Sequence, residues 1–224
     1  MDHQILELPA KSEYEVRLFP LPGTVFFPRN VLPLHIFESR YREMFERAIK
    51  DDQLIAMATL LPGYEDQYYS RPKISPTVCI GHVEAHERTD DGRYNFILSG
   101  LRRAQIEYEI EPVRSYRRAM VQLLDDDAHE PSSSVSMIDQ LIQRLNQTVN
   151  GLEKIVEAFQ DGNISLASFT DVLSFRLPLE MNVKLELLAE TNPSRRTQIL
   201  LASLPQPNVV DPADKEFPPR FSRN

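Results

Sequence analysis

Residues 18–50, LFPLPGTVFFPRNVLPLHIFESRYREMFERAIK, decide the fold of this chain. Prolines at positions 20, 22, 28 and 33 exclude a helix from the first part, because proline lacks the backbone N–H that a helix needs. Gly23, directly after Pro22, fits the third position of a type II turn. Apolar side chains then recur at helical spacing, at Phe37, Tyr41, Met44, Phe45 and Ala48. The stretch therefore predicts a strand, a turn, a short extended segment and a helix, with the prolines interrupting any central strand.

The residues around this stretch predict further short strands. Alternating or apolar runs occupy residues 14–21, 52–63, 78–111 and 116–126. Within residues 78–111, Asp91-Gly92 separates two alternating segments and predicts a β-hairpin. The segment after this turn alternates, so one face should carry Phe96, Leu98 and Gly100.

The pattern becomes helical beyond an acidic, serine-rich linker at residues 125–134. Apolar residues from Ile138 to Phe159 follow the helical repeat and predict one helix of about six turns. Three more helices are expected at residues 165–177, 180–191 and 193–204, the last opened by Asn192-Pro193 as N-cap and first helical residue. We therefore divide the chain into a β-rich part (1–128), a helical part (132–204) and a proline-rich tail (205–224), an α+β organisation.

Composition narrows the class of protein. Hydrophobic residues make up 42% and charged residues 26% of 224, as in an ordinary globular protein. The net charge of −8 argues against a broad phosphate-binding face. The single cysteine, Cys79, excludes an internal disulfide. With no secretory signal and no membrane-length apolar run, a cytoplasmic location is expected.

One strand carries the best candidate for a metal site. His82, Glu84 and His86 alternate, so on a regular strand they share a face and could hold a metal ion. The alternative is a half-buried strand with Val83 and Ala85 inward and the three polar side chains in water. No fourth ligand stands at a recognised spacing, which favours the alternative, and we expect no cofactor.

Two other chemistries have weaker support. Cys79 as a nucleophile would need His35 or His82 as a base, but a lone cysteine is more often a small core residue. No glycine-rich phosphate loop and no GxSxG motif occurs. Basic residues interleaved with an aromatic could bind single-stranded nucleic acid, but the acidic composition and neighbouring glutamates favour paired or solvated strand faces. The basic set is Arg102, Arg103, Arg114, Arg117 and Arg118 with Tyr116.

The stretch FPLPGTVFFPRNVLPLHIFESRYREMFERAI resembles the opening of the Lon protease N-terminal (substrate-binding) domain family. The pattern P-L-x-x-x-V-x-F-P-x-x-x-x-P-L-x-x-F-E-x-R-Y matches at Pro20, Leu21, Val25, Phe27, Pro28, Pro33, Leu34, Phe37, Glu38, Arg40 and Tyr41. The later GHVEAHERTDDGRYNFILSGLRRAQI resembles the family's hairpin and GLxRxxI motif at Gly81, Gly100, Leu101, Arg103 and Ile106. The helical stretch resembles the bundle that follows in the family.

The resemblance implies a PUA-like twisted β pseudo-barrel with one helix, followed by a small helical bundle. It also implies a protein that binds unfolded or client polypeptides, without the ATPase and peptidase domains of complete Lon proteases. A protease or chaperone is then an expected partner, and enzyme activity, membrane association and nucleic-acid binding are not expected. The alternatives left open are a metal- or small-molecule-binding barrel and a PUA-like RNA-binding protein.

The same stretch yields a hypothesis for the binding site. Most of its apolar residues should fill the barrel mouth, as apolar residues usually do. Phe26 and Phe27 are adjacent, however, and in an extended backbone they cannot both point inward. We therefore expect one of them to be exposed and to form a polypeptide-binding patch with Pro22 and Pro28. Glu38 should sit at the positive end of the helix dipole, and Arg40 should hold the proline segment through its carbonyls.

Overall fold

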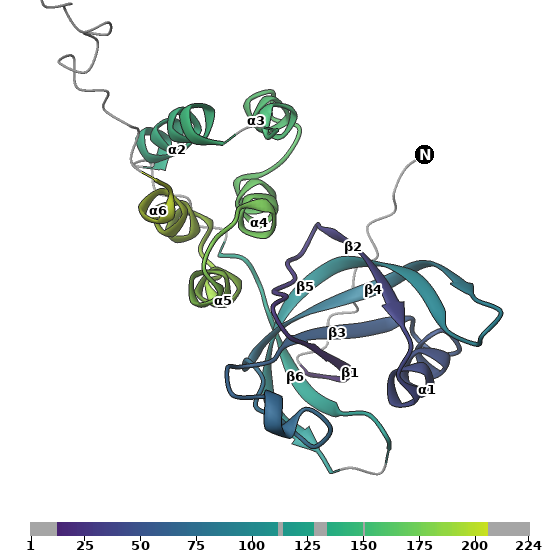
Figure 1. Cartoon of the computed structure of the whole chain (residues 1–224). Coiled ribbons are helices and arrows are strands. Elements are labelled where there is room, and N and C mark those ends of the chain that lie inside the picture. The colour runs from purple at the N-terminus through teal and green to yellow at the C-terminus, as the bar shows by residue number, and fades with distance from the viewer. Residues whose placement is uncertain (1–12, 112–113, 128–133, 150, 206–224) are drawn as a thin grey trace, which may run out of the picture.

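The structure, a computed structural model, describes residues 13–111, 114–127, 134–149 and 151–205. Within them, six strands and one α-helix form the first half and five α-helices form the second (Figure 1). The predicted tail at 206–224 and the middle of the predicted linker lie outside the described residues. The helices of the second half gather at one end of the sheet, while α1 lies at the other (Figure 1).

The six strands form one mixed sheet. They are β1 (Glu13–Leu21), β2 (Val31–Ile36), β3 (Leu54–Thr59), β4 (Thr77–Arg88), β5 (Tyr94–Ile110) and β6 (Arg118–Leu124). Their order is β2-β5-β4-β3-β1-β6, with β1 and β3 parallel and the other pairs antiparallel. The long strand β5 also pairs with β6, so the twisted sheet curls back toward itself (Figure 1). The predicted α+β fold with a twisted, β-rich first half is confirmed.

Two prolines lie inside strands, at positions where they do not interrupt the pairing of a central strand. Pro20 lies in β1 beyond the last residue that pairs with β6, so it pairs on one side only, with Ala58 of β3. Pro33 lies in β2, which is the edge strand of the sheet. Gly100 donates its N–H to the carbonyl of Asn30 (2.8 Å), so the carbonyl of Asn30 points toward β5. Because the backbone polar groups of successive residues point to alternate sides along a strand, the nitrogen of Pro33, three residues later, points toward the free edge. Neither proline removes a ladder hydrogen bond, which explains why both are tolerated.

The hairpin between β4 and β5 agrees with the prediction. Gly92 adopts φ +77° in the turn, a conformation that glycine reaches without strain. Thr89 and Arg93 close the hairpin through a backbone hydrogen bond of 3.0 Å. Beyond the turn, Phe96 and Leu98 are buried while Asn95 and Ile97 are exposed, as the alternation predicts.

Helix α1 (Ser39–Ala48) packs on the sheet through the predicted stripe, apart from its first member. Tyr41, Met44, Phe45 and Ala48 are buried, and the ring of Phe45 contacts those of Tyr94 and Phe96. Phe37 precedes the helix and is 59% exposed, so its assignment to the buried stripe is wrong. A short 3-10 helix, η1 (Glu65–Gln67), follows β3 in the chain.

The second half contains α2 (Ser134–Thr148), α3 (Glu153–Gln160), α4 (Leu166–Arg176), α5 (Met181–Ala189) and α6 (Pro193–Ser203). The single helix predicted from Ile138 to Phe159 is wrong, because it is two helices that meet at Gly151. This glycine has φ +84°, outside the helical region. The apolar periodicity continues across the break because α2 and α3 both turn their apolar side toward the same core. Periodicity alone therefore did not reveal the break.

The predicted starts of α4 and α6 follow ordinary capping chemistry. The hydroxyl of Ser165 accepts a hydrogen bond from the backbone N–H of Ser168. The side-chain oxygen of Asn192 accepts from the N–H groups of Ser194 (2.9 Å) and Arg195 (3.1 Å), with proline at the first helical position. The predicted fourth helix is confirmed.

Two apolar clusters are buried. One packs small and branched residues on one face of the sheet, among them Val16, Leu18, Ala56, Val78 and Ile80. The other is continuous from α1 across the opposite face of the sheet into the helical half, where it includes Phe169, Leu173 and Leu200. The helical half thus shares a core with the sheet. The division into separate parts at 1–128 and 132–204 stays a prediction.

Candidate functional site

The proline–aromatic segment lies between the sheet and the helical half. Phe26 is 2% exposed and Phe27 is fully buried, so the expectation that one of them is exposed is wrong. Pro28 is buried and Pro22 half-buried. The ring of Phe26 meets that of Phe175 in α4 edge to face, with centroids 5.9 Å apart. The sequence analysis assumed that only one side of this segment is buried. The helical half covers its other side as well.

Glycines of the family motif let this segment approach the sheet. A Cβ at Gly100 would lie 2.3 Å from the carbonyl oxygen of Phe27 and 3.1 Å from the Cα of Pro28. A Cβ at Gly81 would lie 2.6 Å from the Cγ of Leu98. Both contacts are too short for any residue but glycine. The two glycines therefore have structural roles.

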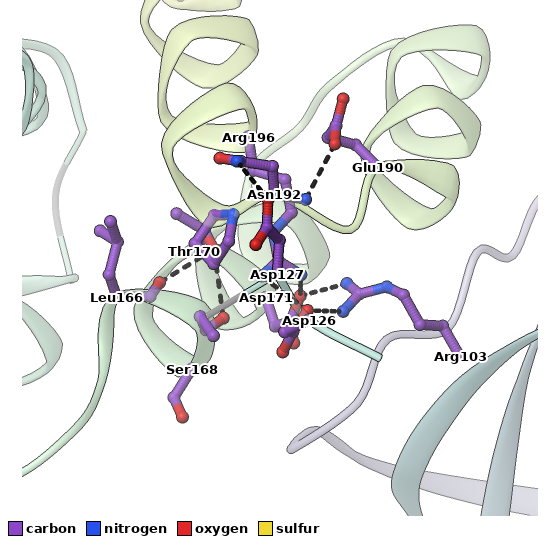
Figure 2. Close-up of polar contacts among 12 residues, drawn as sticks. Arg103, Asp126, Asp127, Leu166, Ser168, Thr170, Asp171, Glu190, Asn192 and Arg196 are labelled. Carbon is purple, nitrogen blue, oxygen red and sulfur yellow. Dashed lines mark hydrogen bonds and ion pairs between the residues drawn. The ribbon is translucent and has the colours of Figure 1, made fainter. Parts of the chain in front are cut away.

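Five charged residues meet where the two halves join, and we call them the junction cluster: Arg29, Arg103, Asp126, Asp171 and Arg196. Figure 2 shows the last four. Arg103, on β5, donates to Asp126 (2.7 Å) and Asp171 (2.5 Å). Arg196, on α6, donates to the same two carboxylates at 3.0 and 2.6 Å. Arg29, in the segment before β2, donates to Asp171 at 2.7 Å. The cluster joins the sheet, the segment before β2 and two helices.

The junction cluster is largely removed from water. The side chains of Asp171 and Arg196 are fully buried and that of Arg103 is 2% exposed. Burial raises the pKa of the Asp171 carboxyl, and the guanidinium groups of Arg103 and Arg196 oppose that rise. Burial lowers the pKa of Arg196, and Asp171 opposes that change. A charged group at such a position is costly without its partners, so the cluster acts as one unit.

Arg103 also reaches the backbone of the helical half. Its Nε donates to the carbonyl of Leu188, near the end of α5, at 3.0 Å. The resemblance marked Arg103, but sequence reasoning missed Arg29, Asp126, Asp171 and Arg196. A signal for one was present, since Asp171 stands among apolar residues in the run FTDVLSF. A carboxylate on a buried helix face calls for a basic partner.

The start of α1 carries the other charged motif residues. Glu38 is the N-cap of α1, as expected, but its side chain makes no capping hydrogen bond. It accepts instead from Arg40 (2.9 Å) and from the hydroxyl of Tyr68 (2.8 Å). Arg40 lies over the rings of Tyr41 and Tyr68 and donates to the carbonyl of Tyr68. The expectation that Arg40 holds the proline segment is wrong, because it holds the loop before β4.

A β-bulge separates the three residues of the predicted metal site. The register of β4 on β5 shifts between Val83 and Ala85, so Glu84 is the extra residue. His82 lies opposite Ser99, whereas His86 lies opposite the buried Phe96 and its ring contacts that of Phe45. The prediction that the three share one face is wrong. Among the described residues, no three histidine, cysteine, aspartate or glutamate side chains are placed to bind a metal ion together.

The other two chemical candidates also take structural positions. Cys79 is fully buried, and burial raises the pKa of its thiol, opposite to what a nucleophile needs. Most of the predicted basic residues are paired: Arg102 with Asp125, Arg103 in the junction cluster, Arg117 with Glu109 and Arg118 with Glu15. Such pairing supports the alternative of paired strand faces over a continuous RNA-binding surface.

Sequence reasoning did not identify an exposed apolar surface on β2, β4 and β5. We call it the outer apolar face and define it by Val31, Pro33, Phe37, Ala85 and Ile97, all of them exposed. Pro33 and Ala85 both lie opposite Ile97 in the register, so their side chains adjoin. Phe37 continues the row beyond β2. The large side chains Val31, Phe37 and Ile97 are 56%, 59% and 40% exposed.

The ring of Phe37 is held in place although it is exposed. It stacks on His35, with ring centroids 6.3 Å apart and planes 27° from parallel. His35 in turn bonds the side chain of Asn95 through its Nδ1 at 2.7 Å. Exposed apolar side chains gathered in this way are typical of binding surfaces.

Comparisons with known proteins agree with the resemblance. A family model described as "ATP-dependent protease La (LON) substrate-binding domain" matches residues 15–206. The Lon protease of Brevibacillus choshinensis is 26% identical over 197 residues, which are 85% of this chain and 24% of that protein. Lon protease 1 of Bacillus subtilis (strain 168) is 20% identical over 215 residues, 93% of this chain and 27% of that protein. The chain spans about a quarter of the length of these relatives.

Solved structures show the same fold. The Lon N-terminal domain protein from Xanthomonas campestris aligns with a TM-score of 0.61 at 22% identity, covering 86% of this chain and 99% of its own. The N-terminal domain of the Mycobacterium avium complex Lon protease aligns with a TM-score of 0.63 at 15% identity, covering 84% and 97%. In the part of this chain that the structure describes, no helix has the length and apolar character needed to cross a membrane.

Proposed function

The chain belongs to the family of ATP-dependent protease La (LON) substrate-binding domains, and from this premise we propose that it binds polypeptide segments on the outer apolar face. The family match supports the class of ligand. The exposure of Val31, Phe37 and Ile97 on one surface is the observation that supports the location. Extended segments of unfolded proteins carry the apolar side chains that such a surface would cover.

We propose that the chain acts without catalysing a reaction. The matched region is the substrate-binding part of the family, and it covers about a quarter of the Lon proteases it resembles. A bound client would then pass to a partner protein, a protease or a chaperone. A cytoplasmic place of action agrees with the single, buried Cys79, which needs no oxidising compartment.

The contacts favour binding of a client on the face of the sheet over binding along its edge. An extended client could also add as a strand beside β2, which has a free side. Pro33 lies in the middle of that edge with its nitrogen outward, so it offers no N–H to an added strand. Side-chain contacts across β2 and β5 remain available.

The proline–aromatic segment is less suited to this task in the conformation described. A client could reach Phe26 only after α4 moved away, because Phe175 covers its ring. Binding by Pro22, Phe26, Phe27 and Pro28 stays a prediction. The outer apolar face needs no such opening.

A matched pair of substitutions tests the location. Val31 is 56% exposed on β2 and Tyr108 is 57% exposed on the distal half of β5, outside the outer apolar face. The probe is a short, unfolded peptide rich in leucine and phenylalanine, carrying a neutral dye for fluorescence anisotropy. We expect Val31→Asp to weaken binding about tenfold, the effect of placing a charge in an apolar contact.

The control variant Tyr108→Asp should bind the probe within about twofold of the unaltered protein. Circular dichroism and thermal unfolding of both variants check that they fold alike. Equal binding by both variants would remove the outer apolar face as the site. Failure of the unaltered protein to bind any apolar, unfolded probe would contradict the proposed function itself.

A further inference from the structure

A small, basic pocket lies between the start of α1, the loop before β4 and the loop before β6. Four arginines, three tyrosines and two serines line its volume of about 130 Å³, and none of its lining residues is acidic. The arginines are Arg40, Arg71, Arg114 and Arg117. We call this the arginine–tyrosine pocket. Four guanidinium groups around one hollow are unusual in a chain with a net charge of −8.

Carboxylates near the pocket neutralise only part of its charge. Glu38 pairs with Arg40, and Glu109 pairs with both Arg71 (3.1 Å) and Arg117 (2.5 Å). Glu43 adds a third carboxylate, since it accepts from the hydroxyl of Ser115 (2.6 Å) and attracts Arg114, although it also pairs with Arg47. Four arginines against three carboxylates still leave the surroundings of the pocket positive. Arg114, which is exposed, makes no ion pair with a described residue. The pocket therefore has a guanidinium group available to a ligand.

Two tyrosines that line the pocket, Tyr41 and Tyr116, are mostly buried. Tyr41 is 5% exposed and Tyr116 is 6% exposed. A tyrosine hydroxyl can both donate and accept hydrogen bonds. Both can donate to an oxygen atom placed in the pocket.

Arg40 and Arg117 are held in place by neighbouring residues, so they offer a ligand a rigid binding surface. Arg40 is held by three aromatic rings and Glu38, with its guanidinium carbon 4.6 Å from the ring centroid of Tyr41. Arg117 bonds both oxygens of Glu109 and the carbonyl of Pro72 (2.8 Å). Side chains fixed in this way lose little freedom when a ligand binds. Arg71 and Arg114 are more exposed and complete the rim.

We propose that the arginine–tyrosine pocket binds a carboxylate of the client polypeptide, from an acidic side chain or from the chain end. The inference rests on the proposed function and adds to it a preference for clients in which an acidic group accompanies an apolar segment. Guanidinium groups bind planar oxyanions through paired hydrogen bonds. The volume suits one such group with its neighbouring atoms.

A nucleic acid fits the same surroundings less well. A phosphate backbone needs a track of cations, because each successive phosphate has its own charge. Two arginines beyond the pocket are already neutralised, Arg118 by Glu15 and Arg17 by Asp51 and Asp52. The four arginines of the pocket surround one small hollow and form no extended track, which favours an isolated carboxylate.

Three peptides with one apolar core and a neutral dye test the inference on the full chain. The first ends in two aspartates with a free carboxyl end, the second in two asparagines with a free carboxyl end, and the third in two asparagines with an amide end. We expect the first or the second to bind about tenfold more tightly than the third, the size of one charge-assisted hydrogen bond. Comparison of the first two identifies the source of the carboxylate.

A double variant assigns the preference to the pocket. Arg71→Gln with Arg114→Gln should reduce the preference for the acidic peptides to less than twofold while the amide peptide binds as before. The matched control is Arg93→Gln with Arg195→Gln, two exposed arginines outside the pocket that lose the same charge. The control should keep the preference.

Each result separates this inference from the proposed function. Equal binding of all three peptides to the unaltered protein, or an equal loss in the control variant, overturns the carboxylate site and leaves polypeptide binding intact. No binding of the amide peptide contradicts the proposed function, and the inference falls with it. Tight binding of a single-stranded oligonucleotide that the double variant abolishes would overturn the inference in favour of nucleic acid.

Discussion

Residues 26–30 and 31–37 follow one another in the chain but end in opposite surroundings. The first piece carries Phe26 and Phe27, both buried where the sheet meets the helical half. The second carries Val31 and Phe37, both more than half exposed. Both pieces are rich in apolar residues, so local sequence does not distinguish them. The difference comes from the second layer, since α4 covers the first piece, whereas Val31 and Phe37 stay more than half exposed.

The two pieces also differ in their connection to the ion pairs of the junction cluster. The first piece contains Arg29, which enters the junction cluster with Asp171. Ion pairs removed from water contribute little net stability, but losing one partner leaves a buried charge that is costly. We infer that the junction cluster fixes how the halves meet. Val31 and Phe37 of the second piece belong to the outer apolar face, where we propose that a client binds.

Substitution of the two phenylalanines tests the comparison with the largest expected effect. Phe26→Ala should lower the free energy of unfolding by about 3–5 kcal/mol, because it leaves a cavity against Phe175. Phe37→Ala should change it by less than about 0.5 kcal/mol, because the ring is exposed. Urea denaturation of both variants measures the two values. Similar values would mean that α4 does not cover the segment in solution.

The junction cluster gives the next prediction. Asp171→Asn keeps the shape of the side chain but removes its charge, leaving three arginines with one carboxylate. We expect a loss of about 3 kcal/mol in the free energy of unfolding. Asp139→Asn, on the exposed side of α2, is the control and should cost less than about 0.5 kcal/mol. A stable Asp171→Asn protein would show that the cluster does not hold the halves together.

The backbone of Arg29 offers a smaller effect. This residue has φ 62°, a conformation that costs a non-glycine residue about 1 kcal/mol. Arg29→Gly and Arg29→Ala both lose the ion pair with Asp171, but only glycine relieves the backbone. We expect the glycine variant to be about 1 kcal/mol more stable than the alanine variant in urea denaturation. Equal stabilities would mean that the turn relaxes when the ion pair is lost.

Local chemistry made much of the fold predictable, and contacts distant in sequence account for the errors. The Asp91-Gly92 turn and the Asn192 cap are set by neighbouring residues, so sequence identified both. The bulge at Glu84 depends on how β4 pairs with β5 and left no local trace. The burial of Phe26 likewise depends on α4, which lies more than a hundred residues later in the chain.

The candidate site was harder to predict than the fold for the same reason. The outer apolar face combines residues of β2, β4 and β5, and its exposure shows only when the helical half is placed elsewhere. The arginine–tyrosine pocket combines the start of α1 with two separate loops. The sequence showed the basic residues near Tyr116 but not that Arg40 faces them. Only pairing and packing bring these groups together.

Pro33 gives the smallest expected change in stability and concerns the exposed piece directly. Its nitrogen faces the free edge of β2, so Pro33→Val adds an outward N–H and a residue that favours strands. The free energy of unfolding should change by less than about 0.5 kcal/mol, because no hydrogen bond within the sheet is gained or lost. The edge, however, would then offer an uninterrupted strand beside an exposed apolar surface. We expect the variant to self-associate more than the unaltered protein, measured by light scattering over a range of concentrations. An unchanged association would mean that the neighbouring side chains already protect the edge, and that the proline is kept for the entry into α1.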